Sequence, residues 1–207
     1  AKDGPVAIVS QSGANSQAIY SLLRDKGLFA RHVHATGNEA DVTVPDLAAA
    51  VAADPGVRLV LLYMEAIKDP SVLASAAAIA RARDVPIVAL KAGRTSSGQK
   101  AASSHTGALA AEDRLVDAFF ERHGIWRAGT PQELVSAAEL YLGSRRPRGK
   151  CLVILSNSGA SCVMGADHAE RRGIPLAPVP KQKLKQVLPA FAATENPIDV
   201  TGALLSD

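Results

Sequence analysis

Cysteines and aromatic residues are scarce in this chain of 207 residues. Its two cysteines, Cys151 and Cys162, are not in a C-x-x-C spacing and have no cluster of histidine or cysteine nearby. The sequence therefore predicts neither a disulfide framework nor a metal site. Aromatic residues make up only 4% of the chain, which leaves few platforms for stacking bases, and the net charge of +3 is mild. This balance argues against nucleic-acid binding and suits phosphorylated small molecules better.

Long apolar runs are also missing. Stretches such as Val57–Met64 are interrupted or fall short of the roughly 18 residues that a membrane-spanning helix needs. The first residues lead straight into an apolar strand, without the apolar core and cleavage pattern of a signal peptide. We therefore expect no membrane segment and a cytoplasmic location.

Apolar runs of strand length alternate with amphipathic stretches of helix length, which is typical of βαβ units around a parallel sheet. Asp69-Pro70 and Thr130-Pro131 carry N-cap and first-turn signals of helices. We expect strands at Val6–Ser10, His32–Thr36, Val57–Met64, Pro86–Lys91 and Cys151–Ser156. We expect helices at Asn15–Lys26, Val44–Ala53, Pro70–Arg83, Ala108–His123 and Pro131–Leu142. The pattern predicts a doubly wound α/β architecture.

A change of composition divides the chain. Residues 143–150 combine glycine, proline and positive charges, as linkers do, and predict a domain of residues 1–146 followed by a second unit of residues 147–207. The motif of residues 8–14 is echoed by residues 154–160, so a strand–loop–helix unit is repeated. The second unit has too few expected strands for a sheet of ordinary size. We expect an incomplete second domain within a longer protein.

The repeated junctions between strand and helix are candidate anion sites. Ser12-Gly13-Ala14 and Ser158-Gly159-Ala160 both lie where a strand gives way to a helix, and free backbone N–H groups at a helix start favour an anion. An ordinary helix cap explains a single copy equally well. Neither a Walker loop nor a G-x-G-x-x-G fingerprint is present, so nucleotide binding by this chain alone is not indicated.

A histidine lies in a segment rich in small residues after the fourth expected strand. His105 follows Lys91-Ala92-Gly93-Arg94 and is flanked by Ser104 and Thr106-Gly107, in what we interpret as a long loop. Loops beyond the carboxyl ends of parallel strands bind ligands in open α/β sheets. Small neighbours leave an imidazole accessible and supply donors for phosphoryl oxygens. An ordinary exposed loop histidine is the alternative that these residues leave open.

At this point the sequence resembles a known family. Ser104–Leu109, preceded by residues 91–94 and followed by Glu112-Asp113, resembles the phosphohistidine loop of NDP-forming acyl-CoA synthetases, relatives of succinyl-CoA synthetase. Other stretches match the same family in the same order: residues 10–13, 37–41 and 63–65, and residues 196–202 for the domain that follows. The ordered combination is far more specific than any single motif.

The resemblance implies a flavodoxin-like, succinyl-CoA-ligase-like domain that is followed by the start of a second one. It implies an enzyme, an acid–thiol ligase that interconverts acyl-CoA, NDP and phosphate with a carboxylic acid, CoA and NTP through an acyl phosphate and a phosphohistidine. His105 would be the nucleophile, and Glu65 would hold its imidazole in one tautomer; capping the helix near Pro70 or pairing with Lys68 is the structural alternative for Glu65. The implied phosphate-binding residues are Ser12, Gly13, Ala14, Thr106, Gly107, Ser158, Gly159 and Ala160. Gly37, Asn38 and Glu39 would line the acyl or CoA side, with a plain turn as the alternative.

The resemblance also implies partners. ATP or ADP with Mg²⁺, and CoA, would be substrates bound mainly by CoA-binding and ATP-grasp domains elsewhere in the protein or on another subunit, and a homo-oligomer is left open. A second hypothesis is a regulatory, ligand-sensing module of the same fold without catalysis. Relatives of that kind commonly replace the histidine, whereas His105 and Glu65 are both present here. A third is a flavin- or nucleotide-binding domain, against which the low aromatic content argues.

Overall fold

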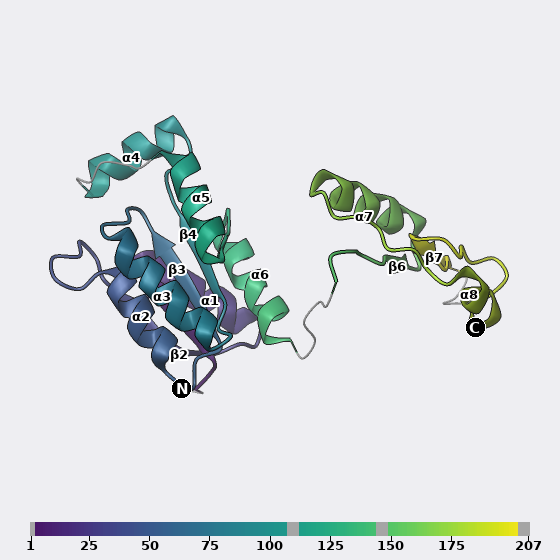
Figure 1. The fold of residues 1–207 in the computed structure, drawn as a ribbon, viewed down its shortest axis with the longest axis horizontal. Helices are drawn as coiled ribbons and strands as arrows, with labels where there is room; N and C mark the ends of the chain where they lie inside the picture. The colour runs from purple at the N-terminus through teal and green to yellow at the C-terminus, as the bar shows by residue number, and fades with distance from the viewer. Residues whose placement is uncertain (1–2, 107–111, 144–148, 203–207) are drawn as a thin grey trace. The chain divides into compact units, whose positions relative to one another are not determined.

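The computed structural model describes residues 3–106, 112–143 and 149–202, and it describes the backbone alone at residues 102–106. The chain forms two compact units, Ala1–Arg146 and Pro147–Asp207. Figure 1 colours them by residue number, from purple at the N-terminus to yellow at the C-terminus. Each unit is described by itself below.

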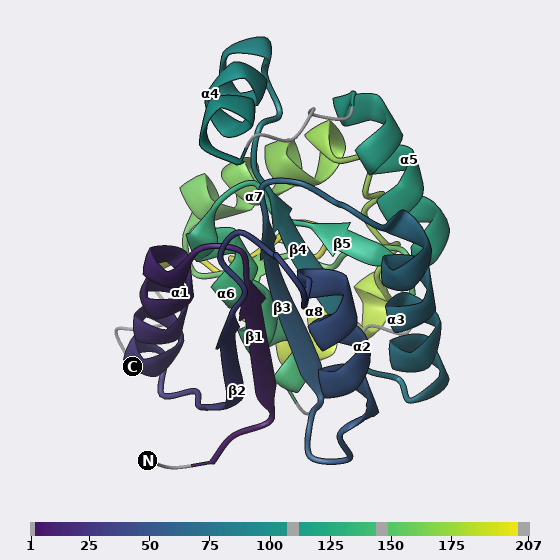
Figure 2. The ribbon, with the colours of Figure 1, turned by 90° about the vertical axis from the view of Figure 1, so that its left-hand side faces the viewer.

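The first unit is built on a parallel sheet. Its described strands are β1 (Val6–Ser10), β2 (Ala30–Ala35), β3 (Leu59–Met64), β4 (Ile87–Lys91) and β5 (Ile125–Arg127). They lie in the order β2-β1-β3-β4-β5, and every neighbouring pair is parallel. The chain reverses its direction of travel across the sheet at β1, as Figure 2 shows. This is the flavodoxin-like order of a doubly wound fold, so the predicted fold class is confirmed.

Helices cover both faces of this sheet. The described helices of the unit are α1 (Gly13–Asp25), α2 (Val44–Ala53), α3 (Pro70–Ala82), α4 (Ser96–Thr106), α5 (Asp113–His123) and α6 (Pro131–Leu142). One core cluster joins the sheet to α2, α3 and α5, and the other joins it to α1 and α6. The sheet is therefore the middle layer of three.

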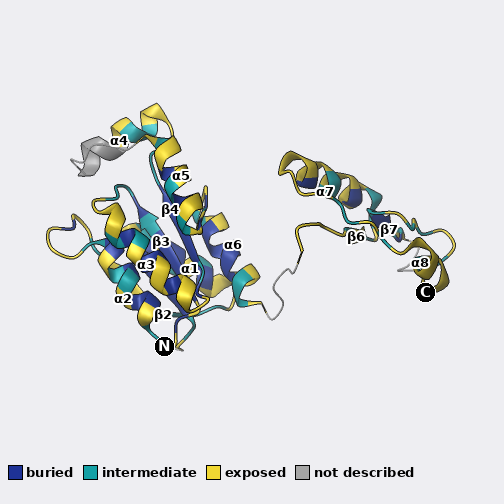
Figure 3. Ribbon diagram, viewed as in Figure 1, coloured by how far each residue is buried: buried dark blue, intermediate teal, exposed yellow. Residues whose placement is uncertain are grey.

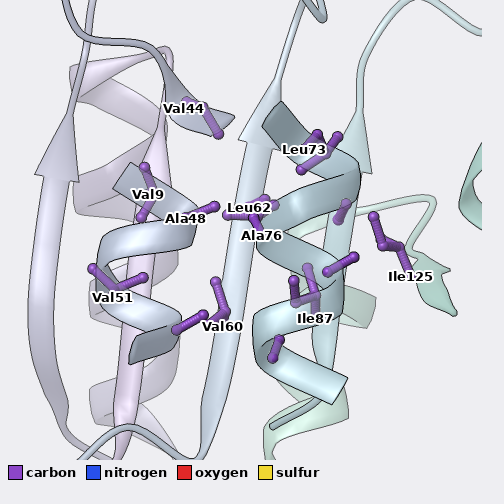
Figure 4. Packing of buried hydrophobic residues seen from close by; sticks show 14 of the residues in the cluster. Val9, Val44, Ala48, Val51, Val60, Leu62, Leu73, Ala76, Ile87 and Ile125 are labelled. Carbon is purple, nitrogen blue, oxygen red and sulfur yellow. The ribbon is translucent and has the colours of Figure 1, made fainter. Parts of the chain in front are cut away.

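Strands β1, β3 and β4 are apolar over most of their length because both of their faces are buried. Val9 and Leu62 are paired in the sheet and point to the α2 and α3 face, where Ala48 and Ala76 meet them (Figure 4). Ile8 faces the opposite way, into the cluster with α1 and α6. Figure 3 shows the resulting buried centre. Such a sheet fixes the strand ends rigidly, and those ends carry the site residues.

The expected helix starts are confirmed. The Asp69 side chain accepts hydrogen bonds from the backbone N–H groups of Ser71 and Val72, and the Thr130 side chain accepts from Glu133 N. Pro70 and Pro131 occupy the first turn, where a missing N–H costs nothing.

The loop interpretation of the segment after β4 is wrong for residues 96–106, which form α4. Thr95 begins this helix, because its hydroxyl accepts from Gly98 N at 3.1 Å and its carbonyl accepts from Gln99 N at 2.8 Å. Helix formers follow at Gln99, Lys100 and Ala101. The many serine, threonine and glycine residues of this segment favoured a loop in the sequence analysis, although the segment forms a capped helix. Strand β5, which has only three residues, was also missed.

The second unit contains a short parallel pair, β6 (Leu155–Ser156) and β7 (Ile198–Asp199), with helices α7 (Gly159–Arg171) and α8 (Lys181–Val187). The expected strand Cys151–Ser156 is reduced to β6 and a single bridge from Leu152 to Leu176. Within the described ranges, the helices of both units are too short or too polar to span a bilayer.

Candidate functional site

The carboxyl ends of the parallel strands bring together the segments that follow β1, β2, β3 and β4. Strand β1 lies between β2 and β3, so the residues after it neighbour those after both strands. Open α/β sheets bind ligands at the point where the strand order reverses. The predicted site residues of the first unit follow these strand ends.

Ser12 caps the start of α1. Its hydroxyl accepts a hydrogen bond from Asn15 N at 3.2 Å, and the Ser10 hydroxyl both donates to Ser12 O at 2.7 Å and accepts from Ser12 N at 3.0 Å. Gly13 is exposed, and a Cβ atom placed on it would meet nothing within 4 Å. The ordinary capping role is therefore confirmed, and the space beside the first residue of the helix is open.

The second unit repeats this junction. Ser158 caps α7, since its hydroxyl accepts from Ser161 N at 3.4 Å, and Ser158 N donates to the Ser156 hydroxyl at 3.1 Å. One difference stands out: a Cβ atom at Gly159 would lie 2.8 Å from Asp199 Oδ2. The space beside Gly159 is therefore taken by a carboxylate of the same unit, whereas the space beside Gly13 is open.

Gln11, which sequence reasoning left out of the site, joins two of the strand ends. Its side chain is buried. The Oε1 atom accepts hydrogen bonds from Glu65 N and from Ala66 N, the latter at 3.0 Å, while Nε2 donates to Ala66 O at 2.8 Å. A glutamine directly after an apolar strand, inside the motif of residues 10–13, was the signal that was available in the sequence.

Glu65 follows β3 and is partly buried. Its Oε1 atom accepts a hydrogen bond from the Tyr63 hydroxyl at 3.3 Å. Burial, together with the negative charge of Glu65, raises the pKa of Tyr63 to about 12, so this phenol is a stable donor at neutral pH. The helix cap at Pro70 that was the alternative role for Glu65 is supplied by Asp69.

Lys68 holds the segment after β2. Its ammonium group donates to Asn38 O at 3.0 Å and to Glu39 O at 2.8 Å. Gly37 and Glu39 have positive φ angles of 61° and 55°, so the backbone turns sharply here. The segment is thus a turn, and Lys68, which follows β3, holds it in place.

The Glu39 carboxylate does not open toward solvent. The residue is 5% exposed, and its Oε1 atom accepts from Val44 N at 2.7 Å and from the Thr36 hydroxyl at 3.3 Å. Its charge therefore satisfies an N–H group at the start of α2. Of the three residues predicted to line the site here, only Gly37 and Asn38 are exposed, and a lining role for the Glu39 side chain finds no support in its contacts.

Two buried cations lie where β4 and β5 end. Lys91 is 3% exposed, and its ammonium group donates to Ala92 O at 2.6 Å. Burial, reinforced by the charge of Arg127, lowers the pKa of Lys91, while Asp113 and Glu65 oppose the shift. Arg127 is paired with Asp113 at 2.5 Å and with Asp117 at 2.7 Å. At this edge the Arg127 guanidinium is therefore paired with two carboxylates, whereas the Lys91 ammonium bonds to a backbone carbonyl. Arg127 was missed because β5 was missed.

The phosphohistidine candidate is placed only by its backbone. His105 and Thr106 are the last two residues of α4, and their side chains lie outside the described residues, as does the whole of Gly107. The helix follows β4, so His105 belongs to a segment that leaves the sheet at the edge where Glu65 and Ser12 lie.

A cavity of about 230 Å³ lies at the opposite edge of the sheet, where β4 and β5 begin. Its polar lining comes from Arg81, Asp84, His123 and Tyr141, and it contains no predicted site residue. Among the residues that the structure describes, no group of three or more His, Cys, Asp or Glu side chains is arranged to hold a metal ion.

Comparison with known proteins gives consistent results. The family model of the succinyl-CoA ligase like flavodoxin domain matches residues 3–141. The ADP-forming acetate–CoA ligase of Methanocaldococcus jannaschii is 37% identical over 202 residues, covering 96% of this chain and 28% of that protein. The alpha subunit of ADP-forming acetate–CoA ligase I of Pyrococcus furiosus is 37% identical over 207 residues, covering 96% of this chain and 43% of that protein.

A solved structure is similar over nearly the whole chain. It is the dinucleotide forming acetyl-coenzyme A synthetase 1 of Ca. Korarchaeum cryptofilum in complex with phosphate and ADP, with a TM-score of 0.88, 31% identity, and coverage of 98% of this chain and 44% of that one. The chain thus spans less than half the length of each of these three relatives.

Proposed function

Because this chain belongs to the succinyl-CoA ligase like flavodoxin family, we propose that it is the phosphohistidine-carrying part of an NDP-forming acyl-CoA synthetase. The observation that carries the proposal is that three segments follow neighbouring strands at one sheet edge: the open helix start at Gly13, Glu65 and the segment that leads to His105. Relatives that are ADP-forming acetate–CoA ligases support the same reaction class.

The proposed reaction has three steps. Inorganic phosphate attacks the acyl carbon of acyl-CoA, and the thiolate of CoA leaves, which gives an acyl phosphate. A neutral nitrogen of the His105 imidazole then attacks the phosphorus, and the carboxylate leaves. Finally the terminal oxygen of NDP attacks the phosphorus and frees the imidazole. The sequence runs backward for acyl-CoA synthesis.

Glu65 holds the imidazole in this scheme. The attacking nitrogen must carry its lone pair, so the other ring nitrogen carries the proton and needs an acceptor. A carboxylate is a strong acceptor for that N–H group, and Glu65 follows the strand next to β4. The donation from Tyr63 to Glu65 Oε1 restricts the carboxylate further.

The transferred phosphoryl group needs donors that do not rearrange. We assign this role to the start of α1 at Ser12, Gly13 and Ala14, to its repeat at Ser158, Gly159 and Ala160, and to Thr106 and Gly107 beside the histidine. Helix starts favour anions through their free N–H groups and their dipole. The common capping pattern of Ser12 and Ser158 supports giving the two junctions the same role.

The remaining substrates require further modules. We propose that CoA and the nucleotide with its Mg²⁺ are bound mainly by CoA-binding and ATP-grasp domains of the same protein or of a partner subunit, and that the enzyme acts in the cytoplasm. The backbone of Gly37 and Asn38, exposed at the edge, is assigned to the acyl or CoA side.

Labelling tests the proposal directly. The full-length enzyme, incubated with Mg²⁺ and ATP labelled in the γ-phosphate, is expected to gain an acid-labile, base-stable label that His105→Ala abolishes. His168→Ala serves as the matched control, because His168 is an exposed residue of α7, and it is expected to keep the label. A label that persists in His105→Ala would remove His105 from the mechanism, whereas a wild-type enzyme that gains no label would favour the non-catalytic module.

Glu65→Gln tests the orienting role. The variant is expected to fold and to form the label about 10-fold to 100-fold more slowly, because small losses of alignment cost rates of this order. Unchanged kinetics would reject the role.

A further inference from the structure

Gln11 continues the pairing of β1 with β3 beyond the last residues of both strands. Its backbone N–H donates to Tyr63 O at 3.0 Å. Its side chain then turns to the next two residues of the β3 chain, accepting from Glu65 N and Ala66 N and donating to Ala66 O. One residue thus makes four hydrogen bonds to the segment 63–66.

The side-chain contacts hold the backbone of Glu65 and of the residue that follows it. Beyond Met64 the chain leaves the sheet, so its N–H groups no longer have a ladder partner and need another acceptor. Gln11 supplies that acceptor from a position that is only 9% exposed, where water competes little. The Cα atom of Glu65 is thereby tied to the residue that precedes Ser12, the cap of α1.

We propose that Gln11 is a positioning residue for phosphoryl transfer, which fixes the Glu65 carboxylate relative to the start of α1. The inference rests on the function proposed above. In that reaction the imidazole must face the carboxylate on one side and the phosphoryl group, held by α1, on the other. The side-chain amide of Gln11 joins the backbone of Glu65 to the segment that leads into α1. It therefore sets the distance between the Glu65 carboxylate and the start of α1.

Gln11→Met is the first variant. Methionine has nearly the same length and shape but neither accepts nor donates strongly, so it removes the three side-chain bonds while filling the space. We expect label formation on His105 to slow about tenfold, with the KM for the nucleotide unchanged, because nucleotide binding lies in another module. Gln17→Met, the same substitution at an exposed residue of α1, is the control and is expected to leave the rate unchanged.

A double-mutant cycle separates positioning from general support of the fold. If Gln11 acts through Glu65, Gln11→Met is expected to slow label formation by no more than about twofold in the Glu65→Gln background, because the aligned carboxylate is already lost. Equal factors in both backgrounds, or no effect in either, would overturn the proposal.

Gln11→Glu keeps the inference testable if Gln11→Met fails to fold. Glutamate keeps an acceptor for Glu65 N and Ala66 N, loses the donor to Ala66 O and adds a negative charge in its place. Its rate is expected to lie between those of the wild type and Gln11→Met, and its effect is likewise expected to vanish with Glu65→Gln. An effect of Gln11→Glu that persists in full in that background would overturn the proposal.

The two proposals fail separately. A label that survives His105→Ala contradicts the proposed function whatever Gln11 does. A label that requires His105, combined with additive effects of Gln11 and Glu65, leaves the function intact and removes only the positioning role.

Discussion

Gly13→Ala separates the fold from the function at the start of α1. Gly13 is the first residue of the helix and has no positive φ angle, and the added Cβ atom would meet nothing within 4 Å. Alanine fits there without strain and reduces the freedom of the unfolded chain. We expect the free energy of unfolding to rise by about 0.5–1 kcal/mol.

The same methyl group is expected to harm phosphoryl transfer. In the proposed site a phosphoryl oxygen approaches the backbone closely beside Gly13, and the methyl group would push it out of hydrogen-bond distance. Losing one hydrogen bond to a charged group costs about 1.5–3 kcal/mol. Since about 1.4 kcal/mol corresponds to a factor of ten, label formation is expected to slow about 10-fold to 100-fold.

Two measurements check this prediction together. Urea unfolding gives the stability, and the rate of label formation in the full-length enzyme gives the function. Gly149→Ala is the control, because a Cβ atom there also meets nothing within 4 Å and the residue lies outside both helix starts. A Gly13→Ala enzyme that is at least as stable as the wild type and equally fast would refute the close approach of phosphate to this residue.

Three further predictions concern single interactions. Asp69→Ala removes the acceptor for the first N–H groups of α3 and is expected to lower the free energy of unfolding by about 1 kcal/mol in urea titration, whereas Asp69→Asn is expected to retain most of it. Hydrogen bonds from Arg31, then from His32 and from a backbone N–H, hold the pKa of Asp54 well below its usual range. The contribution of Asp54 to stability is therefore complete above about pH 4 and declines as the pH falls toward the lowered pKa. This decline is expected to be missing from the pH profile of the stability of Asp54→Asn. Glu65→Gln removes the negative charge near Tyr63 and is expected to lower the pKa of Tyr63 from about 12, though not to the ordinary value, since burial remains. Ultraviolet titration, with Tyr63→Phe as the reference, measures this pKa. An unchanged pKa would place Glu65 away from the phenol.

Local signals explain what could be predicted of the fold. Val44–Ala53 and Pro131–Leu142 were placed with the bounds that the structure has, because each begins with a threonine cap and a proline in its first turn. Strand β1 was also placed within its observed bounds, since a short apolar run followed by Ser-Gly is unambiguous. Helix α4 was misread because its cap, Thr95, lies among other serines, threonines and glycines that favour turns.

The same contrast between local and distant contacts applies to the candidate site. The candidate residues Ser12, Glu65 and His105 were found in the sequence because their motifs are contiguous. Gln11 was not assigned a role, and Lys68 was considered only as a partner of Glu65, since what they do depends on partners distant along the chain: Gln11 bonds to Ala66, and Lys68 to Asn38. Glu39 was placed in the right turn, yet its carboxylate serves the start of α2.

By itself, the sequence determined the alternation of strands and helices, the doubly wound fold class and the motifs of the family, because hydrophobic periodicity, caps and contiguous motifs act over a few residues. Only the tertiary structure decided which strand ends are neighbours, that Gln11 joins the segments after β1 and β3, and that Lys91 and Arg127 are buried beside them. These features depend on the order of strands in the sheet, which is set by packing between residues that lie far apart in the sequence.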